Sequence, residues 1–115
     1  MPFIQIKTNV EVAPEAAEAL KNGLGKSITH LPGKTEPSLM VCLEDKCQLW
    51  FGGKNDKPLA MVEVKTFGGS IDKAGAQAMT EDMYALFQSQ LGVAPSDMYV
   101  RYIAVTDWGW KGTNL

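Results

Sequence analysis

The first two residues offer the most distinctive chemistry in this chain, because a proline directly follows the initiator methionine, Met1-Pro2. Proline has a small side chain, so methionine removal would normally expose its secondary amine. An α-amino group ordinarily has a pKa of about 7.7–8.0, and apolar surroundings lower that pKa because desolvation disfavours the charged form. The residues Phe3-Ile4-Gln5-Ile6 supply such surroundings. Since the proline ring also fixes one backbone angle, the sequence predicts an oriented, neutral general base at Pro2.

Length and composition restrict the class of protein. At 115 residues, with a net charge of −2, the chain is expected to form one domain, residues 1–115, with no basic face for nucleic acid. No apolar run approaches the roughly 18 residues of a membrane span. The N-terminus lacks a signal-peptide pattern, which predicts a cytoplasmic protein, with leaderless export as the alternative. Cys42 and Cys47 are expected to be free thiols, and no metal or cofactor is expected.

The first half of the chain predicts a strand, a helix and a strand. Residues 2–7 alternate as in a strand, and Pro14 suits the first turn of a helix. That helix is predicted to end at Pro32-Gly33 and to bury one stripe of residues, Ala17, Leu20, Leu24, Ile28 and Leu31. Residues 39–43 form a continuous apolar run, typical of a strand covered on both faces. Residues 47–51 are predicted to pair with it as the second half of a hairpin.

The second half repeats this plan. Residues 59–67 predict a strand, and Ser70 is the expected N-cap of a helix that ends near Gly92. Residues 98–105 predict the last long strand, before a short tail. The duplicated β-α-β unit indicates an α+β fold, with a four-stranded sheet, both helices on one face and short extra strands. No helix remains to cover the other face, so we expect sheet-to-sheet oligomerisation.

At this level of detail the chain resembles the macrophage migration inhibitory factor family of the tautomerase superfamily. The resemblance spans the whole chain and rests on motifs in the same order, Met1-Pro2, Thr8-Asn9-Val10, Pro32-Gly33-Lys34, Trp50-Phe51-Gly52-Gly53, Gly75-Ala76-Gln77, Met98-Tyr99-Val100 and Trp108-Gly109-Trp110-Lys111-Gly112-Thr113. It implies a homotrimer whose sheets form a central barrel, with active sites between subunits. The Cys-x-x-Cys of the vertebrate cytokine has no counterpart, because the matching stretch reads Pro58-Leu59-Ala60-Met61.

The same resemblance implies a set of site residues. Pro2 corresponds to the family's catalytic proline, Lys34 to its substrate-binding lysine, and Tyr99 to a tyrosine from the neighbouring subunit. The backbone contributor falls on Thr66 or Phe67. The aromatic wall corresponds to Trp110, with Trp108 where the family often has an aliphatic residue, and Arg101 replaces a neutral amide.

Together these residues predict a keto–enol tautomerase for phenylpyruvate-like aromatic α-keto acids, with dopachrome-type substrates as a second possibility. Lys34 and Arg101 would hold a carboxylate, and Phe67, Trp108 and Trp110 would form a slot for an aryl ring. Structural interpretations also stay open: Arg101 would form an ion pair, and Trp108 and Trp110 would fill the contact between subunits. Two other functions also remain, a cytokine-like signalling protein with a vestigial pocket, and a dehalogenase or decarboxylase of small acids.

Overall fold

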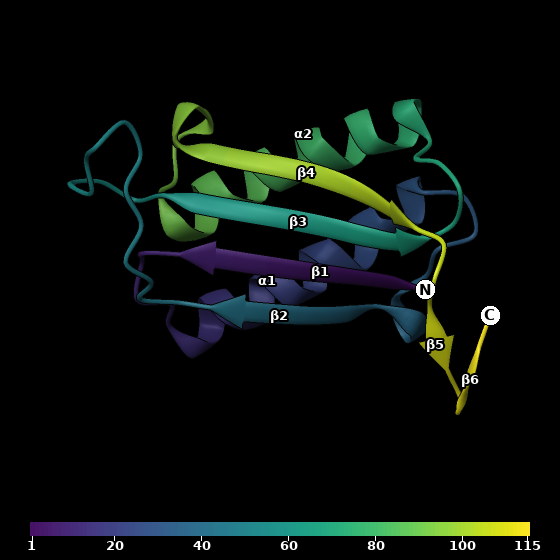
Figure 1. The fold of residues 1–115 in the computed structure, drawn as a ribbon. Helices are drawn as coiled ribbons and strands as arrows, with labels where there is room; N and C mark the ends of the chain where they lie inside the picture. The colour runs from purple at the N-terminus through teal and green to yellow at the C-terminus, as the bar shows by residue number, and fades with distance from the viewer.

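Four strands form one mixed sheet in the computed structural model, which describes residues 1–115. The sheet order is β2-β1-β3-β4, with β1 (Pro2–Thr8) and β3 (Ala60–Phe67) antiparallel at its centre. The outer strands, β2 (Met40–Glu44) and β4 (Met98–Val105), run parallel to their neighbours. Each parallel pair is one β-α-β unit, so the predicted duplication and fold class are confirmed (Figure 1).

Both helices pack on the same face of this sheet (Figure 1). The predicted start of α1 (Pro14–Ser27) at Pro14 is confirmed, and a 3-10 turn, η1 (Ile28–His30), extends it. The second helix, α2 (Lys73–Leu91), ends at Gly92 in the left-handed conformation, as predicted. Its N-cap is Asp72 rather than Ser70, because the Asp72 carboxylate accepts the Gly75 N–H at 2.8 Å. Neither helix is long and apolar enough to cross a membrane.

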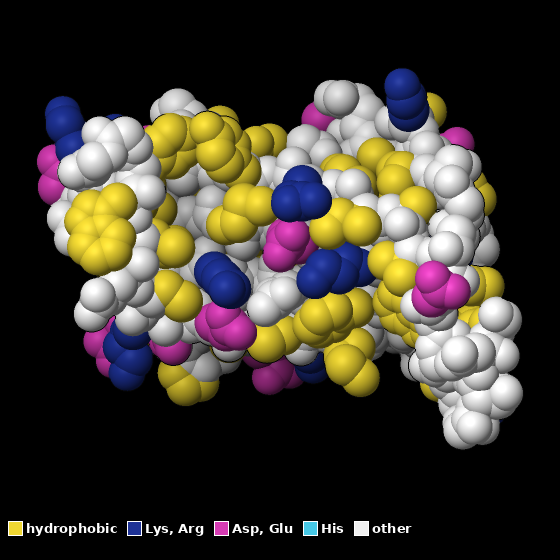
Figure 2. Space-filling view, viewed as in Figure 1, with side chains coloured by type: hydrophobic (Ala, Val, Ile, Leu, Met, Phe, Trp, Pro, Cys, Tyr) yellow, Lys and Arg dark blue, Asp and Glu magenta, His cyan; other side chains and the backbone are white.

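The two faces of the sheet have different surroundings, since strand side chains alternate between them. The helix side buries the core, and in the two central strands this core consists of Ile4, Ile6, Val62 and Val64. The opposite face is uncovered in the single chain, where Met40 is 68% exposed and Tyr99 62%. Figure 2 shows apolar side chains on this face interspersed with lysine, arginine and acidic groups. The coverage of residues 39–43 on both faces, expected from their apolar run, is therefore not provided within one chain.

The prediction of a hairpin strand at residues 47–51 is wrong. After Lys46, which has a positive φ of 52°, the chain passes the end of β1, and the Cys47 N–H donates to the Thr8 carbonyl oxygen at 2.9 Å. Only an isolated bridge joins Phe51 to Lys54. Instead of pairing, Leu49, Trp50 and Phe51 line a cavity at the end of the sheet, and the Phe51 ring packs on Tyr99. The short extra strands occur in the tail, as β5 (Gly109–Trp110) and β6 (Thr113–Asn114).

Candidate active site

Pro2 lies where several chain segments meet at one end of the sheet. It begins β1 opposite Thr66 near the end of β3, beside the end of β4 and the β5–β6 tail (Figure 1). A cavity of about 600 Å³ opens here, and its lining includes Pro2, Phe3, Val105, Trp108 and Trp110. The sheet therefore brings the predicted base and both predicted tryptophans to one cavity.

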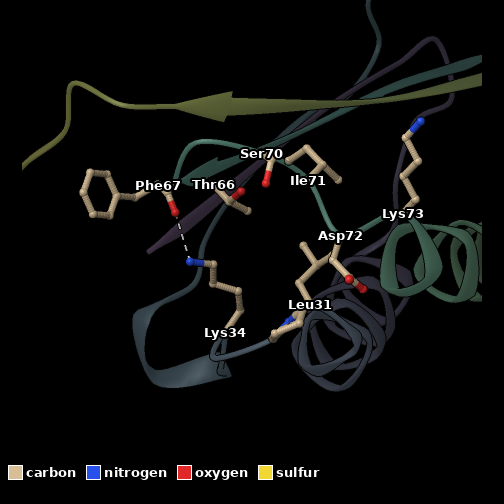
Figure 3. A pocket seen from close by; sticks show the side chains of 9 residues that line it. Leu31, Lys34, Thr66, Phe67, Ser70, Ile71, Asp72 and Lys73 are labelled. Atoms are coloured by element: carbon tan, nitrogen blue, oxygen red, sulfur yellow. Dashed lines mark hydrogen bonds between the residues drawn. The ribbon is translucent and has the colours of Figure 1, made fainter.

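Lys34 reaches the same end of the sheet from the helix side. It follows Gly33, whose positive φ of 75° turns the chain after η1. The Lys34 ammonium Nζ donates to the backbone oxygen of Phe67 at 3.1 Å, while the Phe67 ring points away from Lys34 (Figure 3). Lys34 and Phe67 also line a second cavity, of about 340 Å³, that extends to the start of α2. Phe67 thus separates the lysine from the open face.

Met1 occupies the space beside these groups. The Phe67 N–H donates to the Met1 carbonyl oxygen at 3.0 Å. The pKa of the Met1 amine is lowered from its ordinary value of 8.0, first by burial and then by the charge of Lys34 and a hydrogen bond with it. A terminal amine at this end of the sheet therefore becomes neutral more readily than one in water.

The tryptophans form the outer wall of the Pro2 cavity. Trp108 is half-buried, whereas Trp110, in β5, is 47% exposed. The ammonium of Lys111 lies over the Trp110 ring, 4.3 Å from its centroid, in a cation–π geometry. This wall offers flat apolar surface next to the amine.

Tyr99 and Arg101 lie elsewhere. Tyr99 is opposite Met61, five residues along β3 from Thr66, the partner of Pro2. At about 3.3 Å per residue this separation is about 17 Å, too far for a shared small substrate. Tyr99 packs instead on Phe51, with ring centroids 5.0 Å apart.

Arg101 is on the same open face as Tyr99. Its Nε lies 3.5 Å from the carboxylate oxygen Oε2 of Glu63, the ion pair that the sequence leaves open as the alternative. A single chain therefore joins Pro2, Lys34, Phe67 and the two tryptophans and separates them from Tyr99 and Arg101.

Sequence reasoning missed one ionisable residue at the Pro2 cavity, Lys65 on β3. In the sequence it resembles any solvated strand lysine. Strand alternation places it on the same face as Phe67, and that periodicity was the signal that could have identified it.

Comparisons with known proteins agree with this architecture. The family model for macrophage migration inhibitory factor (MIF) matches residues 1–115. A search of curated proteins finds no match. Among solved structures, MIF2 of Leishmania major is 28% identical with a TM-score of 0.90, over 100% of this chain and 97% of that one. A MIF homologue from Prochlorococcus marinus is 27% identical with a TM-score of 0.83, over 97% of each chain. A protein inactivated by 2-oxo-3-pentynoate shares the fold at 16% identity, with a TM-score of 0.83 over 96% of this chain and 93% of that one.

The family model matches the full sequence, and the solved structures share its strand order and helix placement. The chain therefore belongs to the macrophage migration inhibitory factor family and has the fold of the tautomerase superfamily.

Proposed function

We propose that this protein is a keto–enol tautomerase that acts on aromatic 2-oxo acids of the phenylpyruvate type, with the Pro2 amine as general base. The observation that supports it most is the terminal amine beside Lys34, whose pKa burial and the lysine charge both lower. Methionine removal would transfer the free amine by one residue to Pro2, within the same surroundings. A base that is neutral near pH 7 is the main requirement of this reaction.

The reaction moves one proton. The neutral Pro2 amine takes a proton from the carbon next to the keto group, so the C–H electrons form a carbon–carbon double bond and the keto oxygen gains charge. The protonated amine then gives that proton to the oxygen, which yields the enol and restores the base. Lys34 would hold the carboxylate by a charge-assisted hydrogen bond.

Removal of Met1 also frees a backbone donor. The Phe67 N–H donates to the Met1 carbonyl oxygen, so it would lose its acceptor when Met1 leaves. A fixed N–H at this position would stabilise the charge that develops on a substrate oxygen, as oxyanion-hole donors do. Trp108 and Trp110 would enclose the aryl ring.

The remaining groups would come from a second copy in a homotrimer. Tyr99 is 62% exposed on the uncovered sheet face, and its partner Met61 lies about 17 Å along β3 from Thr66, the partner of Pro2 in its own chain. A phenol from the adjacent subunit would add a donor that one chain lacks. Lys34 and Arg101 are also apart within one chain, so the pairing of two cations on which the dehalogenase or decarboxylase alternative depends would require the second copy as well.

Two measurements on the protein without Met1 test whether Pro2 is the general base. Pro2→Gly, with a primary amine in place of proline, should lower kcat/KM for phenylpyruvate at least about 100-fold, the usual contribution of a general base, with an unchanged oligomer. The conjugated alkynyl ketone 2-oxo-3-pentynoate should add to the neutral Pro2 amine, and peptide mass spectrometry should find the adduct there. Undiminished turnover by Pro2→Gly would end the proposal.

A further inference from the structure

The cavity around Pro2 has one charged side chain in its lining, and this is Lys65 rather than Lys34. Lys65 is directly opposite Phe3 in the β1–β3 pairing, and its Nζ lies 5.6 Å from the centroid of the Phe3 ring. Both residues are half-buried and both line the cavity. The ring therefore holds the ammonium against the cavity wall by a cation–π contact.

Lys65 also lacks a carboxylate partner. The open face carries two other cations, and each has one: Lys7 is 3.9 Å from Glu44 and Arg101 is 3.5 Å from Glu63. None of the chain's five ion pairs includes Lys65, and no acidic residue lines the Pro2 cavity. A half-buried ammonium in a cavity free of acids is available to an anionic group that enters it.

The two lysines approach the N-terminus from opposite sides of the sheet. Lys34 comes from the helix side and binds the backbone oxygen of Phe67 (Figure 3). Lys65 is on the open face, because the buried Thr66 next to it points towards the helices. A molecule with its reacting carbon at Pro2 would therefore have a separate cation on each side.

We propose that Lys65 determines substrate specificity and that the preferred substrates are aromatic 2-oxo acids that carry a second acidic group. The 2-oxo acid end binds at Lys34 and the distal carboxylate at Lys65. This inference rests on the proposed tautomerase function. It predicts a diacid preference that Lys34 alone would not produce.

The test compares phenylpyruvate with 4-carboxyphenylpyruvate, which differ only in the distal carboxylate. Wild-type kcat/KM should favour the diacid about two- to fivefold, the scale of one partly exposed ion pair. Lys65→Met should abolish this preference by lowering kcat/KM for the diacid to the level of phenylpyruvate, and Lys65→Arg should retain it. The control is Lys7→Met, which removes a lysine of the same face that does not line the cavity.

A binding measurement separates this inference from the proposed function. Cinnamate and 4-carboxycinnamate cannot tautomerise, and their affinities follow from quenching of tryptophan fluorescence. Wild-type protein should bind the diacid more tightly, and Lys65→Met should not. If this holds but neither keto acid is turned over, the tautomerase proposal fails and the diacid site stands. Two results would overturn the role of Lys65. One is wild-type turnover of phenylpyruvate without any preference for the diacid, and the other is an equal fall in kcat/KM for both keto acids in Lys65→Met.

Discussion

The two ends of the sheet are both rich in aromatic side chains, yet their chemistry differs. At the Pro2 end the aromatic wall and Lys65 line the cavity beside the terminal amine, and the pKa of that amine is lowered by burial and by Lys34 from the helix side. At the opposite end, Trp50, Phe51 and Tyr99 line a cavity of about 280 Å³. The one acidic group there, Asp97, is paired with Lys57 at 3.3 Å. Aromatic surface alone therefore does not distinguish the two ends of the sheet, whereas a terminal amine with a lowered pKa does.

Each end also lacks what the other has. The Pro2 end has the terminal amine, Lys34 and Lys65 but no phenol, and the far end has the exposed phenol of Tyr99 but no terminal amine. In the proposed homotrimer the two ends of neighbouring copies complete one site. The predictions below test this division, beginning with the largest expected effect.

Mixed oligomers would show whether the two ends act together across subunits. Pro2→Gly and Tyr99→Phe should each form oligomers of low activity, the second because the phenol donor is lost while the ring still packs on Phe51. In a one-to-one mixture, about a quarter of the interfaces would contain an intact Pro2 beside an intact Tyr99. Phenylpyruvate turnover should therefore recover to about a quarter of wild type. If turnover does not recover in verified mixed oligomers, then Pro2 and Tyr99 act within one chain or Tyr99 is not part of the site.

Loss of Lys34 should affect both binding and the base. Lys34→Met should lower kcat/KM for phenylpyruvate about tenfold, because one charge-assisted hydrogen bond to the carboxylate is lost. It should also raise the pKa of the Pro2 amine, since a nearby positive charge favours the neutral form. Only the neutral amine is active, so the rising limb of the pH–rate profile should move to higher pH. Lys73→Met is the matched control, because Lys73 lines the same helix-side cavity but does not contribute to the lowered amine pKa. An equal shift in both variants would contradict a specific role for Lys34.

Arg101 should have the smallest effect of the three. Its partly exposed pair with Glu63 contributes about 0–1 kcal/mol to stability, so Arg101→Asn should leave the melting temperature almost unchanged. If Arg101 assists carboxylate binding in the neighbouring site, KM for phenylpyruvate should rise about threefold at constant kcat. Glu63→Gln, which removes the ion pair but keeps the guanidinium, should not raise KM. If KM rises equally in Arg101→Asn and Glu63→Gln, the ion pair has a structural role and the guanidinium does not bind the carboxylate.

The sequence predicts the elements around Pro2 well, because each follows from a local pattern. Pro14 at the first turn of α1 and Gly92 after α2 mark their helix ends through backbone restrictions that act within a few residues. The β-α-β duplication follows from the order of these elements. The proposed base at Pro2 follows from its position after Met1 at the head of an apolar strand, and the proposed anchor at Lys34 follows from the resemblance to the family. The structure adds that Lys34 lies close enough to lower the pKa of a terminal amine.

The errors occur where contacts distant in sequence decide the outcome. Residues 47–51 have the composition of a strand, but Phe51 packs on Tyr99, 48 residues further along the chain, and does not pair with β2. Lys65 was missed for the same reason, because its importance depends on Phe3 across the sheet and on the tail that closes the cavity. Neither relation is visible in the residues next to them.

Direct titration of the Pro2 nitrogen tests the central claim. The processed protein, labelled with ¹⁵N-proline, would be followed by NMR from pH 5 to 10, roughly the range in which an amine titrates, and kcat/KM for phenylpyruvate would be measured over the same range. The account predicts an amine pKa below 8.0, the ordinary value for a terminal amine, that coincides with the rising limb of the rate profile. An amine pKa at or above 8.0, or a rate profile that rises at a different pH, would contradict a Pro2 base activated by burial and Lys34.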